Sequence, residues 1–404
     1  MLAGVTYLDR ICISMAAPSI RRDLHLDEVQ MGYVFSAFTL AYGLFEMPTG
    51  AWGDRAGTRS VLTRIVIWWS AFTMATATAW NYASLLSMRF LFGIGEAGAW
   101  PNAGRTMARW FPLRERATAQ GIFFMGAHLA GGLTPELVRR LLLFMDWRAV
   151  FVSFGFVGLA WAGAWFRWFR NEPEEHPETN AEERAWIAEG RSAAASKHFD
   201  WSFAGRMFTY GNMLLLCLMY STQTFGFYFC LTWLPQYLEK ERGFSGAALG
   251  WLSGLPLLMC CVADLFGGLT VDRAIKSWGV RWGRGAVCAI SFAVGSAAMF
   301  IGISTADPWL SAFAIGVASA ATAFPLGACW SACTQLGGSY AGLSGGMMNT
   351  AGQVGGFLSP IMIGYARQYW GKDWTVCLYT IAGLFALGAF CWLFIDVQRP
   401  LDQV

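Results

Sequence analysis

Two acid–base pairs lie inside strongly apolar segments of the chain. Glu96 lies in the apolar stretch of residues 82–101, and Arg89 precedes it by seven residues. Seven residues are close to two helical turns, so both side chains fall on one face of a helix. Asp9 and Arg10 interrupt the first apolar segment in the same way. A charge at mid-membrane costs a few kcal/mol even on the mildest scale, so these residues are expected to face a cavity that handles anions and protons.

The charges of these four residues favour coupling between an anion and a proton. Arg89 suits a carboxylate because its planar fork donates two parallel hydrogen bonds. Ionised Asp9 and Glu96 balance Arg10 and Arg89, so an added anion leaves the cavity negative, and protonation of one carboxylate restores neutrality. The alternative is a static ion pair between Arg89 and Glu96 that only joins helices. Adjacent Asp9 and Arg10 point about 100° apart, and we expect Arg10 to face the cavity and Asp9 a neighbouring helix.

The composition predicts an all-α polytopic membrane protein. The chain has 404 residues, of which 55% are hydrophobic and 14% charged, whereas soluble chains carry about 25% charged residues. Apolar runs near 20 residues recur along its whole length, so the bilayer is an expected partner. The net charge of +3 gives no reason to expect nucleic acid. The ten cysteines have no histidine nearby and are interpreted as packing residues, so we expect no metal or cofactor.

Twelve membrane spans are expected in two sets of six, with one polar segment between them. Residues 1–169 form the first six-helix bundle, residues 170–205 a cytoplasmic linker, and residues 206–404 the second bundle. Within the linker, Thr179 and Glu182 have the spacing of a capping box that opens a short helix. The spans are expected near residues 1–20, 29–52, 60–79, 84–107, 117–143, 149–169, 207–238, 247–269, 286–303, 309–334, 340–365 and 374–394.

Basic residues in the short loops predict the orientation in the membrane. The loops after the third and ninth spans carry no Lys or Arg, so by the positive-inside rule both termini face the cytoplasm and the chain lies in the cell membrane. The first span has no basic residue before Asp9, which predicts that the native chain begins upstream. The loops after the second, fourth and eighth spans hold Arg55, Arg59, Arg109, Arg114, Arg116, Arg273, Lys276, Arg281 and Arg284.

The two halves of the sequence carry a similar motif at corresponding positions. The sequence GDR at residues 53–55 follows the second span, and VDR at residues 271–273 follows the eighth. Prolines interrupt many spans, among them Pro48, Pro101 and Pro256. Repeated halves with Gly- or Pro-broken helices are typical of secondary transporters that rock around a site at mid-membrane.

Several motifs resemble those of the major facilitator superfamily. Residues 53–59, GDRAGTR, resemble its loop signature between helices 2 and 3, and Arg89 with Gly93 and Gly95 resembles its helix 4 motif. Within the superfamily the chain is similar to the anion:cation symporter family, which includes bacterial galactonate, glucarate and hexuronate transporters and animal sialin. The segments that carry this second resemblance are YLDR at 7–10, MGYVFS at 31–36, EAGAWPN at 96–102, RWFPLRERA at 109–117, TWLPQY at 232–237 and GGMMN at 345–349.

The resemblance implies roles for individual residues. Asp9 and Glu96 match the two proton-carrying acids of the family's galactonate transporter, and Arg10 and Arg89 match its in-membrane arginines. Tyr7, Tyr42 and Asn349 match polar residues of its substrate cavity. The chain departs from that pattern at His128 and Glu46, where the galactonate transporter has glutamine. The loop residues expected to gate the cavity, by stabilising its outward-open state, are Asp54, Arg55, Arg59, Asp272 and Arg273.

Further candidates come from residue chemistry alone. His128 could donate to a sugar hydroxyl, titrate near neutral pH, or be a hydrogen-bonded structural histidine. Asn349 and Gln353, one turn apart, could bind hydroxyls or bridge helices. Glu46 is interpreted as a structural hydrogen-bonding residue, with gating or binding of a second proton as alternatives, and Asp264 as a structural or gating residue. The rings that could stack on a sugar are Trp330, Trp233 and Tyr237.

We therefore expect a major facilitator fold that carries a small organic anion and protons together by alternating access. The anion is expected to be a sugar acid such as a hexonate, hexarate or hexuronate, and the chain to act as a monomer. Alternatives are a sodium-coupled or phosphate-type carrier and a transporter-like ligand sensor. A membrane enzyme is disfavoured, because the sequence offers no nucleophile–base–orienter set.

Overall fold

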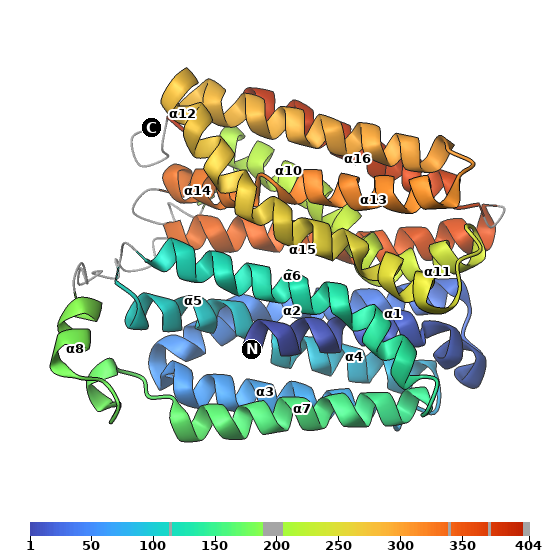
Figure 1. Ribbon diagram of the computed structural model, residues 1–404, viewed down its shortest axis with the longest axis horizontal. Helices are drawn as coiled ribbons and strands as arrows, with labels where there is room; N and C mark the ends of the chain where they lie inside the picture. Colours follow the sequence, from blue (N-terminus) through green and yellow to red (C-terminus); the bar gives the residue numbers. More distant parts are fainter. Residues whose placement is uncertain (113–114, 189–204, 338–340, 371–372, 399–404) are drawn as a thin grey trace.

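The computed structural model is built from α-helices that run side by side along the long axis of the molecule (Figure 1). It describes residues 1–112, 115–188, 205–337, 341–370 and 373–398. The first half contains α1 Leu2–Leu24, α2 Glu28–Ala56, α3 Thr58–Thr76, α4 Tyr82–Glu96, α5 Ala99–Trp110, α6 Arg116–Leu141 and α7 Trp147–Trp168. The second half contains α10 Gly211–Thr232, α11 Leu234–Lys240, α12 Gly246–Ser304, α13 Pro308–Ala323, α14 Leu326–Gly337, α15 Ala341–Tyr369 and α16 Thr375–Phe394.

Each of the twelve expected spans coincides with one of these helices, with part of one, or with a consecutive pair. The long helix α12 joins two spans through Gly279, whose φ of 76° and ψ of 168° break the helical geometry. The spans formed by α10–α11 and α13–α14 are interrupted close to Pro235 and Pro325. Proline removes a backbone donor and its ring clashes with the preceding turn, so a helix breaks there.

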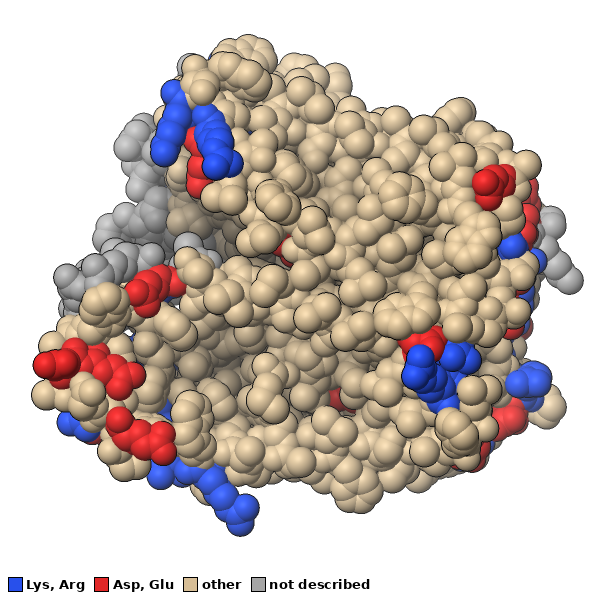
Figure 2. Space-filling model, viewed as in Figure 1, with Lys and Arg blue, Asp and Glu red and all other residues tan. Residues whose placement is uncertain are grey.

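The molecule has a broad apolar face suited to a bilayer. In the part of the chain that the structure describes, five stretches are each long and apolar enough to cross a membrane: Trp147–Trp168, Gly211–Thr232, Gly246–Ser304, Pro308–Gly337 and Thr375–Phe394. Figure 2 shows that Lys, Arg, Asp and Glu gather towards the two ends of the molecule and leave the surface between them largely free of charge. Large apolar side chains such as Phe266 and Phe300 are more than half exposed, and lipid tails can cover them.

The two halves meet along two helix pairs, α2 with α15 and α6 with α12. Glycines make the contact close at the end of the bundle near α11, which we call the closed end. A Cβ atom at Gly254 of α12 would lie 1.8 Å from the backbone oxygen of Gly132 of α6, and one at Gly32 would lie 2.6 Å from the oxygen of Pro360. Because no side chain fits at Gly32 or Gly254, the backbones approach directly and seal the two halves together at this end.

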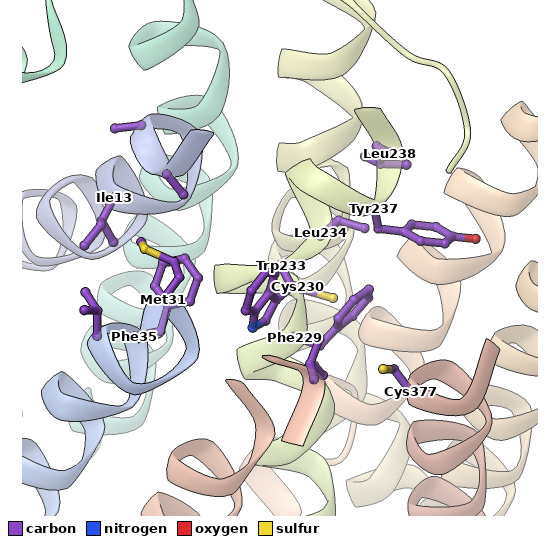
Figure 3. Packing of buried hydrophobic residues seen from close by; sticks show 14 of the residues in the cluster. Ile13, Met31, Phe35, Phe229, Cys230, Trp233, Leu234, Tyr237, Leu238 and Cys377 are labelled. Carbon is purple, nitrogen blue, oxygen red and sulfur yellow. The ribbon is translucent and has the colours of Figure 1, made fainter. Parts of the chain in front are cut away.

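Aromatic packing strengthens the closed end (Figure 3). Phe35 of α2 meets Trp233 edge-on, with ring centroids 5.5 Å apart, and the Trp233 indole donates to the oxygen of Pro360 at 3.2 Å. Tyr237 lies further into the second half, where its hydroxyl lies 3.0 Å from that of Ser311. Trp233 and Tyr237 are 0% and 1% exposed. Both rings therefore pack within the core in this structure, and the expectation that they stack on a substrate stays a prediction.

The polar segment after α7 holds a 3-10 turn, Pro173–Glu175, and the short helix α8, Ala181–Ala188. Asn180 caps α8, since its side-chain oxygen accepts from the backbone N–H of Glu183 at 2.8 Å. The capping box was expected one residue earlier, at Thr179. The Thr179 hydroxyl instead donates to the oxygen of Pro173 at 2.5 Å, which holds the preceding turn.

Candidate functional site

The centre of the first half holds an ion pair between α1 and α4. Arg10 donates from Nε to Oε1 of Glu96 at 2.6 Å, and its Nη2 lies 2.5 Å from the same oxygen. The Glu96 side chain is fully buried and its Oε2 is without a hydrogen bond in the described part of the chain. Gly93 lets α4 approach α2 closely, because a Cβ there would lie 2.6 Å from the oxygen of Phe38. The helix 4 glycine thus brings Glu96 to the depth of Arg10.

Arg10 is surrounded by aromatic rings and remains partly accessible. Its guanidinium carbon lies 4.9 Å from the ring centre of Phe38, 5.0 Å from that of Tyr42 and 5.4 Å from that of Tyr7. Stacked rings hold a guanidinium in place without using up its hydrogen-bond donors. Its side chain is 9% exposed. The aromatic rings therefore fix the position of the Arg10 guanidinium, and some of its N–H groups remain able to donate to an anion.

Asp9 and Arg89 lie behind this pair, deeper in the first half. Both oxygens of Asp9 are buried and without a well-formed hydrogen bond within the described residues, and the indole N–H of Trp69 lies close enough to act on this carboxylate. Arg89 is 2% exposed and packs over Phe92 at 4.5 Å, and within the described residues it forms no hydrogen bond. Asp9 interacts electrostatically with both Arg89 and Glu96. The four charges form one buried cluster in which Arg10, and not Arg89, contacts Glu96.

The second half faces this cluster with polar groups of α10 and α15. The hydroxyl of Tyr228 donates to Oε1 of Gln353 at 3.4 Å, and Tyr228 interacts electrostatically with Arg10. Gln353 is half-buried, so its amide can serve a ligand held by Arg10. Sequence reasoning found Gln353 but missed Tyr228, since a single tyrosine in the apolar run of α10 carries no distinguishing signal.

Two polar contacts link the halves on either side of the cluster. Nδ1 of His128 on α6 lies 2.6 Å from Oδ2 of Asp264 on α12, and Nδ2 of Asn349 on α15 donates to Oε2 of Glu46 on α2 at 2.5 Å. Each acid lies eighteen residues after the first residue of its helix, or about 27 Å along it. The two contacts therefore lie at similar depth, far from the closed end.

Trp330 and the loop residues take positions outside this centre. Trp330 of α14 is half-buried and meets Tyr220 edge-on at 6.3 Å. Arg59 donates from Nε and Nη2 to the oxygen of Phe166 at 2.9 and 2.6 Å, so it binds the end of α7 within its own half. The side chain of Asp54 lies outside the described residues, and Arg55, Asp272 and Arg273 are exposed. The structure thus does not join Arg59 to Asp272 or Arg273.

Comparison with known proteins identifies the class. The sequence model of the Major Facilitator Superfamily matches residues 1–360 of the chain. The chain therefore belongs to this superfamily of membrane transporters, and within it to the anion:cation symporter group. The family consists of multi-pass transporters and not enzymes. Among solved structures, a D-xylose–proton symporter is similar with a TM-score of 0.77 at 15% identity, covering 99% of this chain and 97% of that one. This likeness shows the fold.

Curated relatives resemble the chain over its full length. A probable sulfoacetate transporter of Cupriavidus necator is 34% identical, covering 99% of this chain and 92% of that protein. A probable galactarate/D-glucarate transporter of Bacillus subtilis is 30% identical, covering 90% and 83%. A D-galactonate transporter of Escherichia coli is 27% identical, covering 98% and 94%. The substrates in these names are all small organic anions.

Proposed function

We propose that the protein is a proton-coupled symporter that carries a small organic anion, with sugar acids as the first candidates, into the cytoplasm. The observation that carries the proposal is the contact between Arg10 and Glu96, a partly accessible guanidinium held against a fully buried carboxylate. A substrate carboxylate that takes over donors of Arg10 weakens its hold on Glu96. Glu96 without its partner in an apolar site then binds a proton more readily.

Coupling follows from this exchange of partners. The anion and the proton each favour the binding of the other, because each proton cancels one negative charge that the anion brings to a buried site. Alternating access then requires that the helix pairs α2–α15 and α6–α12 open at the closed end and close at the other. We propose that both termini lie on the cytoplasmic side, as the loop charges predict.

Uptake by the purified protein in liposomes tests the proposal. Labelled D-glucarate should accumulate when the lumen is alkaline relative to the outside, and a protonophore should abolish this accumulation. Sulfoacetate and D-galactonate, tested as unlabelled competitors, rank the substrate classes named for the relatives. Accumulation that follows a sodium gradient and ignores the pH gradient would favour the sodium-coupled alternative. Binding without counterflow would favour a sensor.

A further inference from the structure

The contact between His128 and Asp264 joins the two halves inside the molecule. His128 is 4% exposed, and the side chain of Asp264 is 12% exposed. Oδ2 of Asp264 faces Nδ1 of His128, whereas Oδ1 is buried and has no hydrogen-bond partner among the residues that the structure describes. Within the described residues Asp264 forms no ion pair with Lys or Arg. A carboxylate in such a place lacks a compensating positive charge unless a proton joins the pair.

The pair is connected to the Arg10–Glu96 contact through one side chain. The ring of Tyr7 meets the imidazole of His128 edge-on, with centroids 5.9 Å apart, and lies 5.4 Å from the guanidinium carbon of Arg10. Tyr7 thus stands between the charged cluster of the first half and Asp264 of the second. The other titratable groups that interact electrostatically with Tyr7 or Asp264 include Tyr220 and Tyr228 of α10 and Cys260 and Cys261 of α12.

The charge balance at the interface between the two halves also favours bound protons there. Asp9 and Glu96 offset Arg10 and Arg89, but Asp264 and Glu46 add two further acids at the interface between the halves. Within the described residues Glu46 accepts a side-chain hydrogen bond from the neutral amide of Asn349 and forms no direct ion pair, although it lies within electrostatic range of Arg10. An empty carrier with every acid ionised would hold two uncompensated negative charges there, which a low-dielectric interior disfavours.

We propose that the His128–Asp264 pair is a further proton-binding site of the carrier, located on the interface between its two halves. With one ring hydrogen, His128 donates from Nδ1 to Asp264 and the pair carries one negative charge. One more proton, on Nε2 of His128 or on Oδ1 of Asp264, makes the pair neutral, and no other bond changes. Because the two residues belong to different halves, the proton stabilises their contact. The inference rests on the proposed proton coupling. It assigns one of the coupled protons to the His128–Asp264 pair, in addition to those bound by Asp9 and Glu96.

The direct test needs no substrate. Infrared difference spectra of the purified protein in lipid, between mildly acidic and mildly alkaline buffer, record the titration of imidazole and carboxyl groups. We expect a titration signal that Asp264→Asn and His128→Gln each remove. Glu239→Gln, an exposed acid of the same half, serves as the matched control and should retain that signal, as should Asp264→Glu, which keeps the acid. If Asp264→Asn and His128→Gln both gave the same difference spectra as the wild-type protein, the proposal would be overturned.

A second readout measures coupling. The pH gradient that just stops net movement of labelled D-glucarate gives the number of protons carried with each anion. We expect Asp264→Asn to carry one proton fewer than the wild type and Glu239→Gln to match it; an unchanged ratio in Asp264→Asn would overturn the proposal. Failure of the wild-type protein to move any of the tested anions would contradict the proposed function, and the infrared result would still decide the role of Asp264.

Discussion

Arg10 of α1 directs both Nε and Nη2 at a single oxygen of Glu96 on α4, at 2.6 and 2.5 Å, and leaves the other oxygen of that carboxylate unbonded. The guanidinium of Arg10 therefore binds only one of the two carboxylate oxygens of Glu96. A ligand carboxylate can approach Arg10 without first displacing a two-oxygen salt bridge, and the free oxygen of Glu96 is available for a proton. This geometry makes Arg10 the first residue to test.

Arg10→Lys should weaken ligand binding more than Arg89→Lys does. Lysine keeps the charge but loses the fork, and a hydrogen bond to a charged group contributes about 1.5–3 kcal/mol. At about 1.4 kcal/mol for each factor of ten, the dissociation constant should rise roughly tenfold to a hundredfold. Isothermal titration of each folded variant with the preferred anion measures the effect. A larger loss in Arg89→Lys would mean that the buried guanidinium, and not the partly accessible one, binds the ligand.

Gly254→Ala should force the closed end apart. Its Cβ would lie 1.8 Å from the backbone oxygen of Gly132, and backbone cannot move aside as a flexible side chain can. Spin labels on Phe144→Cys and Trp309→Cys, both exposed at this end, should show a longer distance than in the parent. Gly268→Ala is the matched control, because nothing lies within 4 Å of a Cβ there. The same distances in both alanine variants would argue against a glycine-dependent seal.

Arg59→Lys should lower thermal stability more than Arg55→Lys. Arg59 donates twice to the oxygen of Phe166 and lies over its ring at 4.5 Å, whereas Arg55 is exposed. Loss of one such bond should lower the free energy of unfolding by about 1 kcal/mol, which a thermal melt of the detergent-solubilised protein can resolve. Equal melting temperatures would indicate that the contact with α7 contributes little and would return Arg59 to a purely gating role.

The fold could be predicted from the sequence because a membrane leaves few choices. Backbone groups in lipid must bond within their own segment, so apolar runs become helices, and the break in α12 occurs at a glycine, Gly279. The partners of the buried charges could not be predicted in the same way. Spacing places Arg89 and Glu96 on one helix face, but the tertiary arrangement of α1 and α4 decides that Glu96 meets Arg10. His128 and Asp264 lie 136 residues apart, and only the docking of the two halves brings them together.

The paired assay of Glu96→Gln tests the central claim, that Glu96 couples proton to anion, most directly. Glutamine resembles the protonated acid and lacks its charge, so the loaded variant should exchange substrate across the membrane while pH-driven accumulation is lost. A purely structural Glu96 would behave differently, since breaking a buried ion pair on one side costs about 3–5 kcal/mol and both activities would fall together. Counterflow and gradient-driven uptake are measured on the same proteoliposomes with quantified, folded protein. Retained counterflow without accumulation is the predicted result; parallel loss of both, or full retention of accumulation, would contradict it.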